Sequence, residues 1–230
     1  MSERFTNKYD TIKQPAQSKQ MLAYQQIKED ILNNTFPPGT VMVERKLCDI
    51  YHVSRSPIRN ALQQLTHEGL LSFVPGKGVV VSSFTTEDIL EVYDLIELHQ
   101  IYAVNICIAK GSQAAIDALA AVSANMEQAL AAGDIFQCTR WDQKFHELLV
   151  EYAGNHRLQS IFEQLACQQM RFMTTVLEDA SLASRSQEEH RKILDAIIAG
   201  DSQAAAESIR THYRHIKKYY VDKLLVRLQF

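Results

Sequence analysis

The sequence has no apolar stretch long enough to cross a membrane, since none of its hydrophobic runs approaches the roughly 20 residues that span a bilayer as a helix. The first twenty residues, MSERFTNKYDTIKQPAQSKQ, are polar and lack the apolar centre of a secretion signal. Apolar residues nevertheless make up 46% of the 230-residue chain, which is enough to fill a core. We therefore expect a soluble, cytoplasmic globular protein without a membrane partner.

Cysteine is also scarce, and the four that occur, Cys48, Cys107, Cys138 and Cys167, lie far apart in the chain. This spacing excludes a zinc ribbon, whose cysteines come in close pairs, and the dense disulfide framework of a small secreted domain. We expect reduced thiols in a hydrophobic core. The sequence also contains no repeat of fixed period, no low-complexity tract and no long linker.

The formal net charge of −3 is unevenly distributed along the chain. Residues 1–82 carry 10 Lys and Arg against 7 Asp and Glu, a net +3. Residues 83–230 carry 14 against 20, a net −6. Because a partner responds to the local field and not to the sum, the basic first third is compatible with nucleic-acid binding.

Residues 22–82 alternate short helical patterns with strong turn signals. Apolar residues at helical spacing predict helices over 22–32 and 44–51, and the segment NNTFPPGT separates them. A third helix is predicted from Ser54 to Gly69. The segment LLSFVPGKGVVVSSF then has β-branched and apolar residues on either side of PGKG, which indicates a hairpin. Three helices and a two-stranded wing predict a winged helix-turn-helix.

The predicted third helix has well-defined start signals. Ser54 is a good N-cap, and Pro57 lies in the first turn, where its missing N–H costs nothing. Its buried stripe is expected to contain Ile58, Ala61, Leu62 and Leu65. In a winged helix this helix enters the major groove, and its N-terminal residues meet the DNA. Serine hydroxyls suit phosphate and arginine suits phosphate or a guanine edge, so Arg55, Ser56 and Arg59 are candidate DNA contacts, although exposed arginines at a solvated helix start remain the alternative.

From residue 86 onward the pattern is helical throughout. Six helices with short connections are predicted, beginning at 86, 112, 134 and 155, then at Ser186, where SQEE resembles a capping box, and at Asp201. The expected fold is therefore mainly α: an N-terminal winged helix-turn-helix followed by an all-α bundle of six helices. We expect a flexible tail over 1–18, the DNA-binding domain over 19–82, and a helical domain over 83–230, with SSFTTED at the boundary.

With these features in place, residues 20–82 resemble the GntR family of bacterial transcription regulators, and residues 86–220 resemble its FadR C-terminal (FCD) ligand-binding domain. The matching segments are PPGT at 37–40, Glu44 with Leu47, VSRSPIRNAL at 53–62, EGLL at 68–71 and PGKGVVV at 75–81. The resemblance implies a homodimer on a short palindromic double-stranded operator, with the helical domain responsible for effector binding and dimerisation.

The resemblance also implies site residues in the DNA-binding domain. The positions that contact DNA at the helices are Arg45, Ser54, Arg55, Ser56, Pro57 and Arg59, and those at the wing tip, which approaches the minor groove, are Pro75, Gly76 and Lys77.

A second candidate site lies in the helical domain. Asp142 and His146 stand four residues apart, so on a helix they share one face, and His190 and His212 follow later. Spacing alone leaves open a surface pair or a core histidine. The family resemblance favours a metal site, because many FCD domains have an aspartate, a histidine four residues beyond it and two later histidines as ligands. Carboxylate and imidazole suit a divalent ion such as Zn²⁺, Ni²⁺ or Mn²⁺.

The sequence departs from the family at the effector site. Family members often have an arginine in the first helix of this domain, where it helps to hold an effector carboxylate. Here no arginine occurs from 79 to 139, and Ile96 and Gln100 lie near the expected places. Either the effector lacks the usual acid, or another cation, such as the metal or Arg171, holds it. We expect a small organic acid of open identity, with no assigned effector-binding residues.

Three functions are compatible with these features. The first is a ligand-responsive transcription regulator, expected to be a repressor and not an enzyme. The alternative is a hydrolase-like metalloenzyme that uses the Asp/His site to activate water. Against it, the only acids near the ligands that could act as a base, Glu147 and Glu189, are expected to face solvent. The third is a helical scaffold that binds a partner protein.

Overall fold

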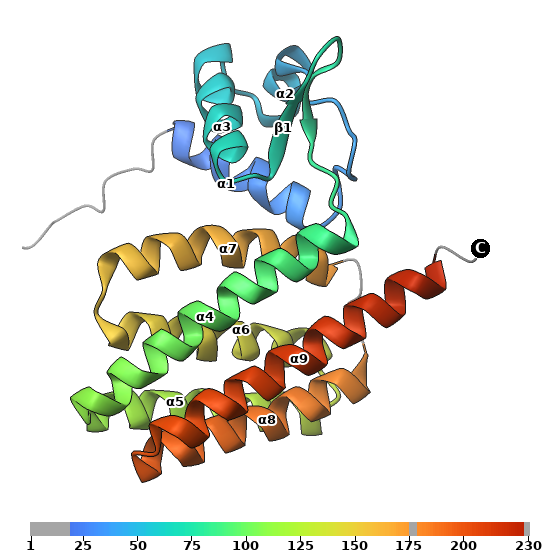
Figure 1. The fold of residues 1–230 in the computed structure, drawn as a ribbon. Helices are drawn as coiled ribbons and strands as arrows, with labels where there is room; N and C mark the ends of the chain where they lie inside the picture. The colour runs from blue at the N-terminus through green and yellow to red at the C-terminus, as the bar shows by residue number, and fades with distance from the viewer. Residues whose placement is uncertain (1–18, 175–178, 228–230) are drawn as a thin grey trace, which may run out of the picture.

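The computed structural model describes residues 19–174 and 179–227, so the expected tail over 1–18 lies outside the described residues (Figure 1). The first elements are three helices and a hairpin: α1 (Lys19–Leu32), α2 (Glu44–Tyr51), α3 (Arg55–His67), β1 (Leu71–Val74) and β2 (Gly78–Val81). The strands pair antiparallel, with Leu71 opposite Val81 and Val74 opposite Gly78. The winged helix-turn-helix predicted from the sequence is confirmed.

Helix α3 is held in place by the apolar stripe expected from the sequence. Ile58, Ala61, Leu62 and Leu65 are all buried, and they pack in one cluster with Ala23, Ile27 and Ile31 of α1. Burial of each large aliphatic side chain stabilises this small module by about 1.5–3 kcal/mol. Ser54 occupies the N-cap position with an extended backbone, but its side chain makes no capping hydrogen bond. Its hydroxyl is therefore not used within α3.

The second part of the described chain consists of six helices: α4 (Thr86–Lys110), α5 (Gln113–Ala131), α6 (Ile135–Ala153), α7 (His156–Thr174), α8 (Ala180–Ala199) and α9 (Ser202–Arg227). Helix α4 packs against α6 and α9, α5 packs against α6 and α8, and α8 also packs against α9. Local signals define most of the ends: Thr85 and Asp88 form a capping box, Ser112 and Asp134 cap α5 and α6, and Gly111, Gly154 and Gly200 terminate helices in the left-handed conformation. The expected mainly α fold is confirmed.

The predicted start of the fifth of these helices at Ser186 is wrong. Helix α8 begins at Ala180, where the Asp179 carboxylate accepts hydrogen bonds from the backbone N–H groups of Ser181 and Leu182. Ser186 and Glu189 are buried inside the helix. Their spacing of three residues, which resembles a capping box, places both side chains on the face that packs into the bundle.

The two hydrophobic cores meet at α7, which Figure 1 shows directly beneath the winged helix. Cys167 of α7 is buried in the N-terminal core. At the end of α3, the Glu68 carboxylate accepts hydrogen bonds from Lys28 and Tyr24 of α1, and it lies 3.9 Å from the Cys167 sulfur. The end of α3 is thus connected to α1 and to the bundle. The boundaries at 18 and 82 stay predictions.

No helix in the described part of the chain is both long and apolar enough to span a membrane.

Candidate nucleic-acid interface and metal centre

The leading end of α3 is open to solvent. Ser54, Arg55, Ser56 and Arg59 are exposed, as is Arg45 on α2, while Pro57 is half-buried. The structure thus brings the sequence-predicted helix residues to one accessible end of the module, where the N–H groups of α3 also lack intrahelical partners. This arrangement suits a polyanion. The role of each residue in DNA binding stays a prediction.

Arg59 does not extend freely into solvent. Its guanidinium donates two hydrogen bonds to the Glu44 carboxylate at the start of α2, from Nε and Nη2, each 3.0 Å long. The hydrogen bonds from Arg59 hold the pKa of Glu44 below its usual range. A bidentate pair of this kind fixes the plane of the guanidinium and leaves one side of it for another acceptor. The sequence did not show that Glu44, matched only as a family position, holds a candidate DNA contact.

The tip of the wing is accessible, as expected of a hairpin that approaches the minor groove of DNA. Its tip residues Pro75, Gly76 and Lys77 are exposed, and in Figure 1 the tip lies at the end of the module farthest from the bundle. Gly76 has φ = 79°, a left-handed conformation that a residue with a side chain rarely adopts. The hairpin therefore depends on glycine at that position to present Lys77.

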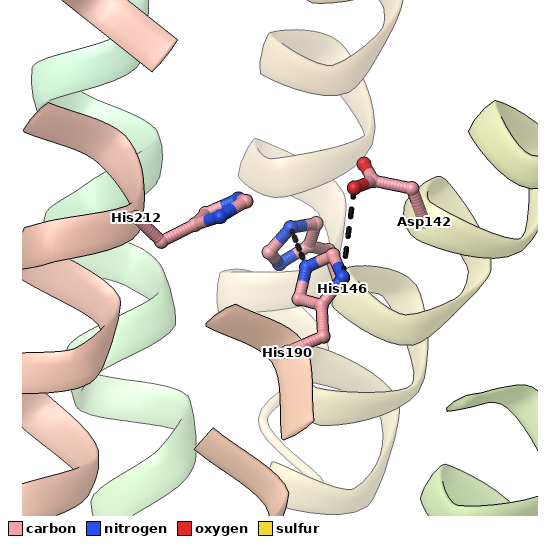
Figure 2. Close-up of side chains that lie close together, drawn as sticks. All are labelled: Asp142, His146, His190 and His212. Atoms are coloured by element: carbon pink, nitrogen blue, oxygen red, sulfur yellow. Dashed lines mark hydrogen bonds and ion pairs between the residues drawn. The ribbon is translucent and has the colours of Figure 1, made fainter. Parts of the chain in front are cut away.

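The four candidate metal ligands converge inside the bundle. Asp142 and His146 lie one turn apart on α6, His190 lies on α8, and His212 lies on α9 (Figure 2). One ligand atom from each side chain lies within 4.8 Å of the other three. The imidazole Nε2 atoms of His146 and His190 are 3.0 Å apart. Two nitrogens bound to one tetrahedral zinc ion at about 2.1 Å would lie about 3.4 Å apart, so the observed spacing is close to that of a shared ion.

The protonation state of this cluster suits metal binding. Burial lowers the pKa of His146 well below its ordinary value, and the neighbouring His190 lowers it further. Burial likewise lowers the pKa of His190, with His212 contributing. Both imidazoles are therefore neutral near pH 7 and keep a lone pair for a cation. The Asp142 carboxylate, which accepts a hydrogen bond from the Ser186 hydroxyl, supplies the anionic donor.

One ligand nitrogen of the cluster is left without a hydrogen-bond partner among the described residues. It is the buried Nε2 of His212. The rings of His146, His190 and His212 form a triangle: the His212 ring centroid lies 5.2 Å from that of His146 and 4.7 Å from that of His190, and the other two are 4.8 Å apart. A buried polar atom without a partner is costly, and a metal ion in this position would satisfy it. The residues present therefore fit a divalent cation.

Sequence reasoning missed the polar groups around these ligands. Glu189 was expected to face solvent, but it is 6% exposed and accepts hydrogen bonds from His212 and His215. That expectation was wrong because α8 turns Glu189 toward α9. His215, the second partner of Glu189, is half-buried. Tyr213 also contacts His146, with its hydroxyl 3.2 Å from Nδ1. Positions 186, 189, 190 and 193 recur at helical spacing, so the sequence could have indicated that they share one face of a helix. That this face is buried is seen only in the structure.

The positions at which an effector-binding arginine was sought are both buried. Ile96 is 0% exposed, and Gln100 is 0% exposed and donates a hydrogen bond from Nε2 to the backbone carbonyl of His146. The Oε1 of Gln100 has no partner among the described residues. Gln100 therefore links α4 to the ligand-bearing α6 and keeps one acceptor atom unused. The side chain of Arg171, considered as an effector contact, lies outside the described residues.

A winged helix joined to an all-helical domain with an interior Asp/His cluster defines a class of DNA-binding regulators, and the comparisons identify which. Residues 20–81 match the family described as bacterial regulatory proteins, gntR family, and residues 88–215 match the FCD domain. The chain belongs to the GntR family of bacterial transcription regulators and carries an FCD domain. The resemblance inferred from the sequence is confirmed.

Curated relatives agree over most of their length. The HTH-type transcriptional regulator YdhC of Bacillus subtilis (strain 168) is 31% identical over 199 residues, which cover 84% of this chain and 86% of the relative. The HTH-type transcriptional repressor GlaR of Escherichia coli (strain K12) is 28% identical over 200 residues, which cover 82% of this chain and 90% of GlaR.

Solved structures share the fold at low sequence identity. A GntR transcriptional regulator from Rhodococcus sp. RHA1 matches with a TM-score of 0.76 and 22% identity, covering 89% of this chain and 98% of that one. E. coli McbR/YncC matches with a TM-score of 0.75 and 17% identity, covering 90% and 99%.

Proposed function

We propose that this protein is a homodimeric, ligand-responsive repressor that binds a palindromic operator and whose FCD domain holds a divalent metal and a small organic acid. The observation that carries the proposal is the combination, in one chain, of an open α3 start with a buried Asp/His cluster that fits a cation. The relative named as a repressor, GlaR, supports the direction of regulation.

The DNA-binding end divides into two kinds of contact. Ser54, Ser56 and the free N–H groups at the start of α3 suit phosphate oxygens, which fix the position of the helix on the duplex. Arg55 and Arg59 suit a guanine edge, where a guanidinium donates two hydrogen bonds. Arg45 and the wing residues Gly76 and Lys77 would add contacts to the neighbouring backbone and minor groove.

The metal centre would supply a cation for the effector. Asp142, His146, His190 and His212 would hold Zn²⁺, Ni²⁺ or Mn²⁺, and such an ion offers a Lewis-acid contact to a carboxylate. This contact could take over the part that an arginine would otherwise play, which fits the absence of arginine from 79 to 139. The unused Oε1 of Gln100 would accept a hydrogen bond from a hydroxyl of the ligand.

The metal site is connected to the winged helix-turn-helix through α6 and α7. Gln143, the residue after Asp142, donates a hydrogen bond to the Met170 sulfur of α7 at 3.5 Å. Cavities of about 680 and 420 Å³ separate α6 from parts of α1 and α7, and Gln143 lines both. A ligand that shifts α6 would therefore act on the contact between the bundle and α1. A coupling of about 1–3 kcal/mol would suffice for regulation.

Dimerisation has a suitable surface on α4. Leu95, Leu98 and Tyr102 lie on one face of this helix and are 46%, 63% and 47% exposed. A second copy of the chain that covered this apolar face would remove it from water. The dimer would then place two winged helix-turn-helix modules on one duplex. Leu98→Glu is expected to yield monomers by sedimentation velocity, whereas Ile198→Glu, at an exposed apolar residue of α8, leaves the dimer intact.

The decisive experiment is selection of bound fragments from genomic DNA, followed by fluorescence anisotropy on the enriched sequence. We expect a two-fold symmetric site, and the organic acids that are handled by the products of neighbouring genes become the ligand candidates. Enrichment without any shared sequence would contradict the proposal.

The metalloenzyme alternative gains no support from the cluster. Glu189, the acid nearest the ligands, is already bound to two histidines, and the Glu147 side chain is 40% exposed. The relatives and both matched domains are those of transcription regulators.

A further inference from the structure

We propose that Glu189 is a positioning residue for the metal centre: it fixes His212 with the Nε2 lone pair directed at the ion and supplies the second negative charge that a buried divalent cation needs. The inference rests on the metal site proposed above. It concerns a residue outside the four ligands.

The first argument is geometric. Glu189 is on α8, next to the ligand His190, and its Oε2 lies 2.9 Å from the Nδ1 of His212 on α9. The other oxygen, Oε1, lies 2.5 Å from the Nδ1 of His215. His212 and His215 stand three residues apart on α9, about one helical turn. Together they hold both oxygens of a single carboxylate. The carboxylate has little freedom to rotate, and the His212 ring is fixed with it.

The second argument concerns the tautomer of His212. A carboxylate that accepts hydrogen bonds from both sides requires a proton on each Nδ1. In neutral His212 the remaining ring nitrogen, Nε2, then carries the lone pair. That is the atom that is buried and without a partner among the described residues. The interaction with Glu189 therefore selects the tautomer that can bind a metal, as carboxylate–histidine pairs do in other metal sites.

The outer nitrogens of the other two histidines lie closest to neutral groups. The Nδ1 of His146 lies 3.2 Å from the Tyr213 hydroxyl, and the Nδ1 of His190 lies 3.4 Å from the Met126 sulfur. The carboxylate nearest to His190 Nδ1 is the ligand Asp142, at 3.6 Å. Within the described residues, His212 is thus the ligand whose outer nitrogen contacts a carboxylate that is not itself a ligand.

The third argument is charge balance. Each oxygen of Glu189 accepts a hydrogen bond from an imidazole N–H, which is the arrangement of an ionised carboxylate. A divalent ion with three neutral imidazoles and Asp142 would leave one positive charge in the bundle, and Glu189 cancels it. Because an unbalanced charge in an interior is expensive, Glu189 lowers the cost of holding the ion.

The test compares Glu189→Ala and Glu189→Gln with wild type, measuring Zn²⁺ affinity by competition with a chromophoric chelator. Glu189→Ala should weaken binding about 10- to 100-fold, the usual effect of losing such a partner. Glu189→Gln should fall between the two, because an amide oxygen can still accept from His212 while the charge is lost. Glu188→Ala, a change at the exposed neighbouring residue, should leave the affinity unchanged.

A second readout separates positioning from general stability. Nitrogen-15 NMR of the metal-free protein should show His212 protonated at Nδ1 in wild type and in Glu189→Gln, and as a mixture of tautomers in Glu189→Ala. Equal Zn²⁺ affinity in wild type and Glu189→Ala, or a wild-type His212 protonated at Nε2, overturns the inference. A wild-type protein that binds no Zn²⁺, Ni²⁺ or Mn²⁺ overturns the proposed metal site itself.

Discussion

The two candidate sites of this protein are built in opposite ways. At the start of α3 the functional side chains are exposed, and of the arginines there only Arg59 has a hydrogen-bonded carboxylate partner among the described residues. In the bundle the ligands come from α6, α8 and α9, and His146, His190 and His212 are each no more than 4% exposed. The DNA-binding site is therefore a set of exposed hydrogen-bond donors, whereas the metal site is a buried and preorganised set of ligands.

This difference reflects the partners. A duplex brings many phosphates, and its contacts are made in water, so flexible exposed donors suffice and counterion release supplies much of the affinity. A single ion must be removed from water completely, so each ligand must already be oriented. We therefore expect substitutions at the start of α3 to change DNA binding alone. Substitutions at the Asp/His cluster of the bundle should change metal affinity and stability together.

The largest effect is expected from the double variant Arg55→Ala/Arg59→Ala. Each arginine that contacts a base edge contributes about 10- to 100-fold to operator affinity, so the double variant should lose the operator almost completely in a gel-shift titration. Its metal content and melting temperature should match wild type. Arg191→Ala, which removes an exposed arginine paired with Glu127 on the bundle, is the matched control and should bind normally. Unchanged affinity in the double variant would exclude α3 as the reading helix.

Metal removal should produce the next largest effect, this time on stability. At a free Zn²⁺ concentration 100 times the dissociation constant, binding should stabilise the wild-type protein by about 2.7 kcal/mol and raise its melting temperature by roughly 5–10 °C. Excess chelator should reverse the shift. His190→Ala should show no shift, because it removes a ligand, whereas His156→Gln at the exposed start of α7 should behave as wild type. Differential scanning fluorimetry with and without Zn²⁺ measures both.

The same contrast explains which features the sequence could predict. Helix α3 was predicted to within about two residues because its start, its stripe and its ending glycine are all local signals. The start of α8 was missed because Ser186 and Glu189 match a capping box locally, while their actual partners, Asp142 and His212, come from α6 and α9. The four ligands could be named only through the family, since spacing along α6 says nothing about which later histidines approach it. Partners of Glu189 depend on how α8 packs against α9.

A pH dependence should distinguish the two regions further. Burial lowers the pKa of His146 and His190 in the folded state, whereas the unfolded chain has the ordinary value near 6.5. Below that pH the unfolded chain binds protons that the folded one excludes, so metal-free stability is full above about pH 6.5 and falls on acidification. The slope should reach at most about 1.4 kcal/mol per pH unit for each histidine. Urea unfolding of metal-free protein between pH 7.5 and 5.5 checks this, and His146→Gln should reduce the slope; a flat profile in wild type would contradict it.

The smallest expected effect comes from Glu44→Ala, which tests whether Glu44 orients the Arg59 side chain near the start of α3. Without its two hydrogen bonds to Glu44, the Arg59 guanidinium becomes free to pair with any phosphate. Loss of the carboxylate also removes a charge that repels the DNA backbone. We expect operator affinity to fall at most about fivefold while affinity for unrelated DNA rises, so that the ratio of the two falls more than either alone. Anisotropy titrations on operator and scrambled duplexes at one salt concentration measure this ratio, and Glu29→Ala on α1 serves as a charge-matched control. If both variants change the two affinities equally, Glu44 acts only through its charge and does not orient Arg59.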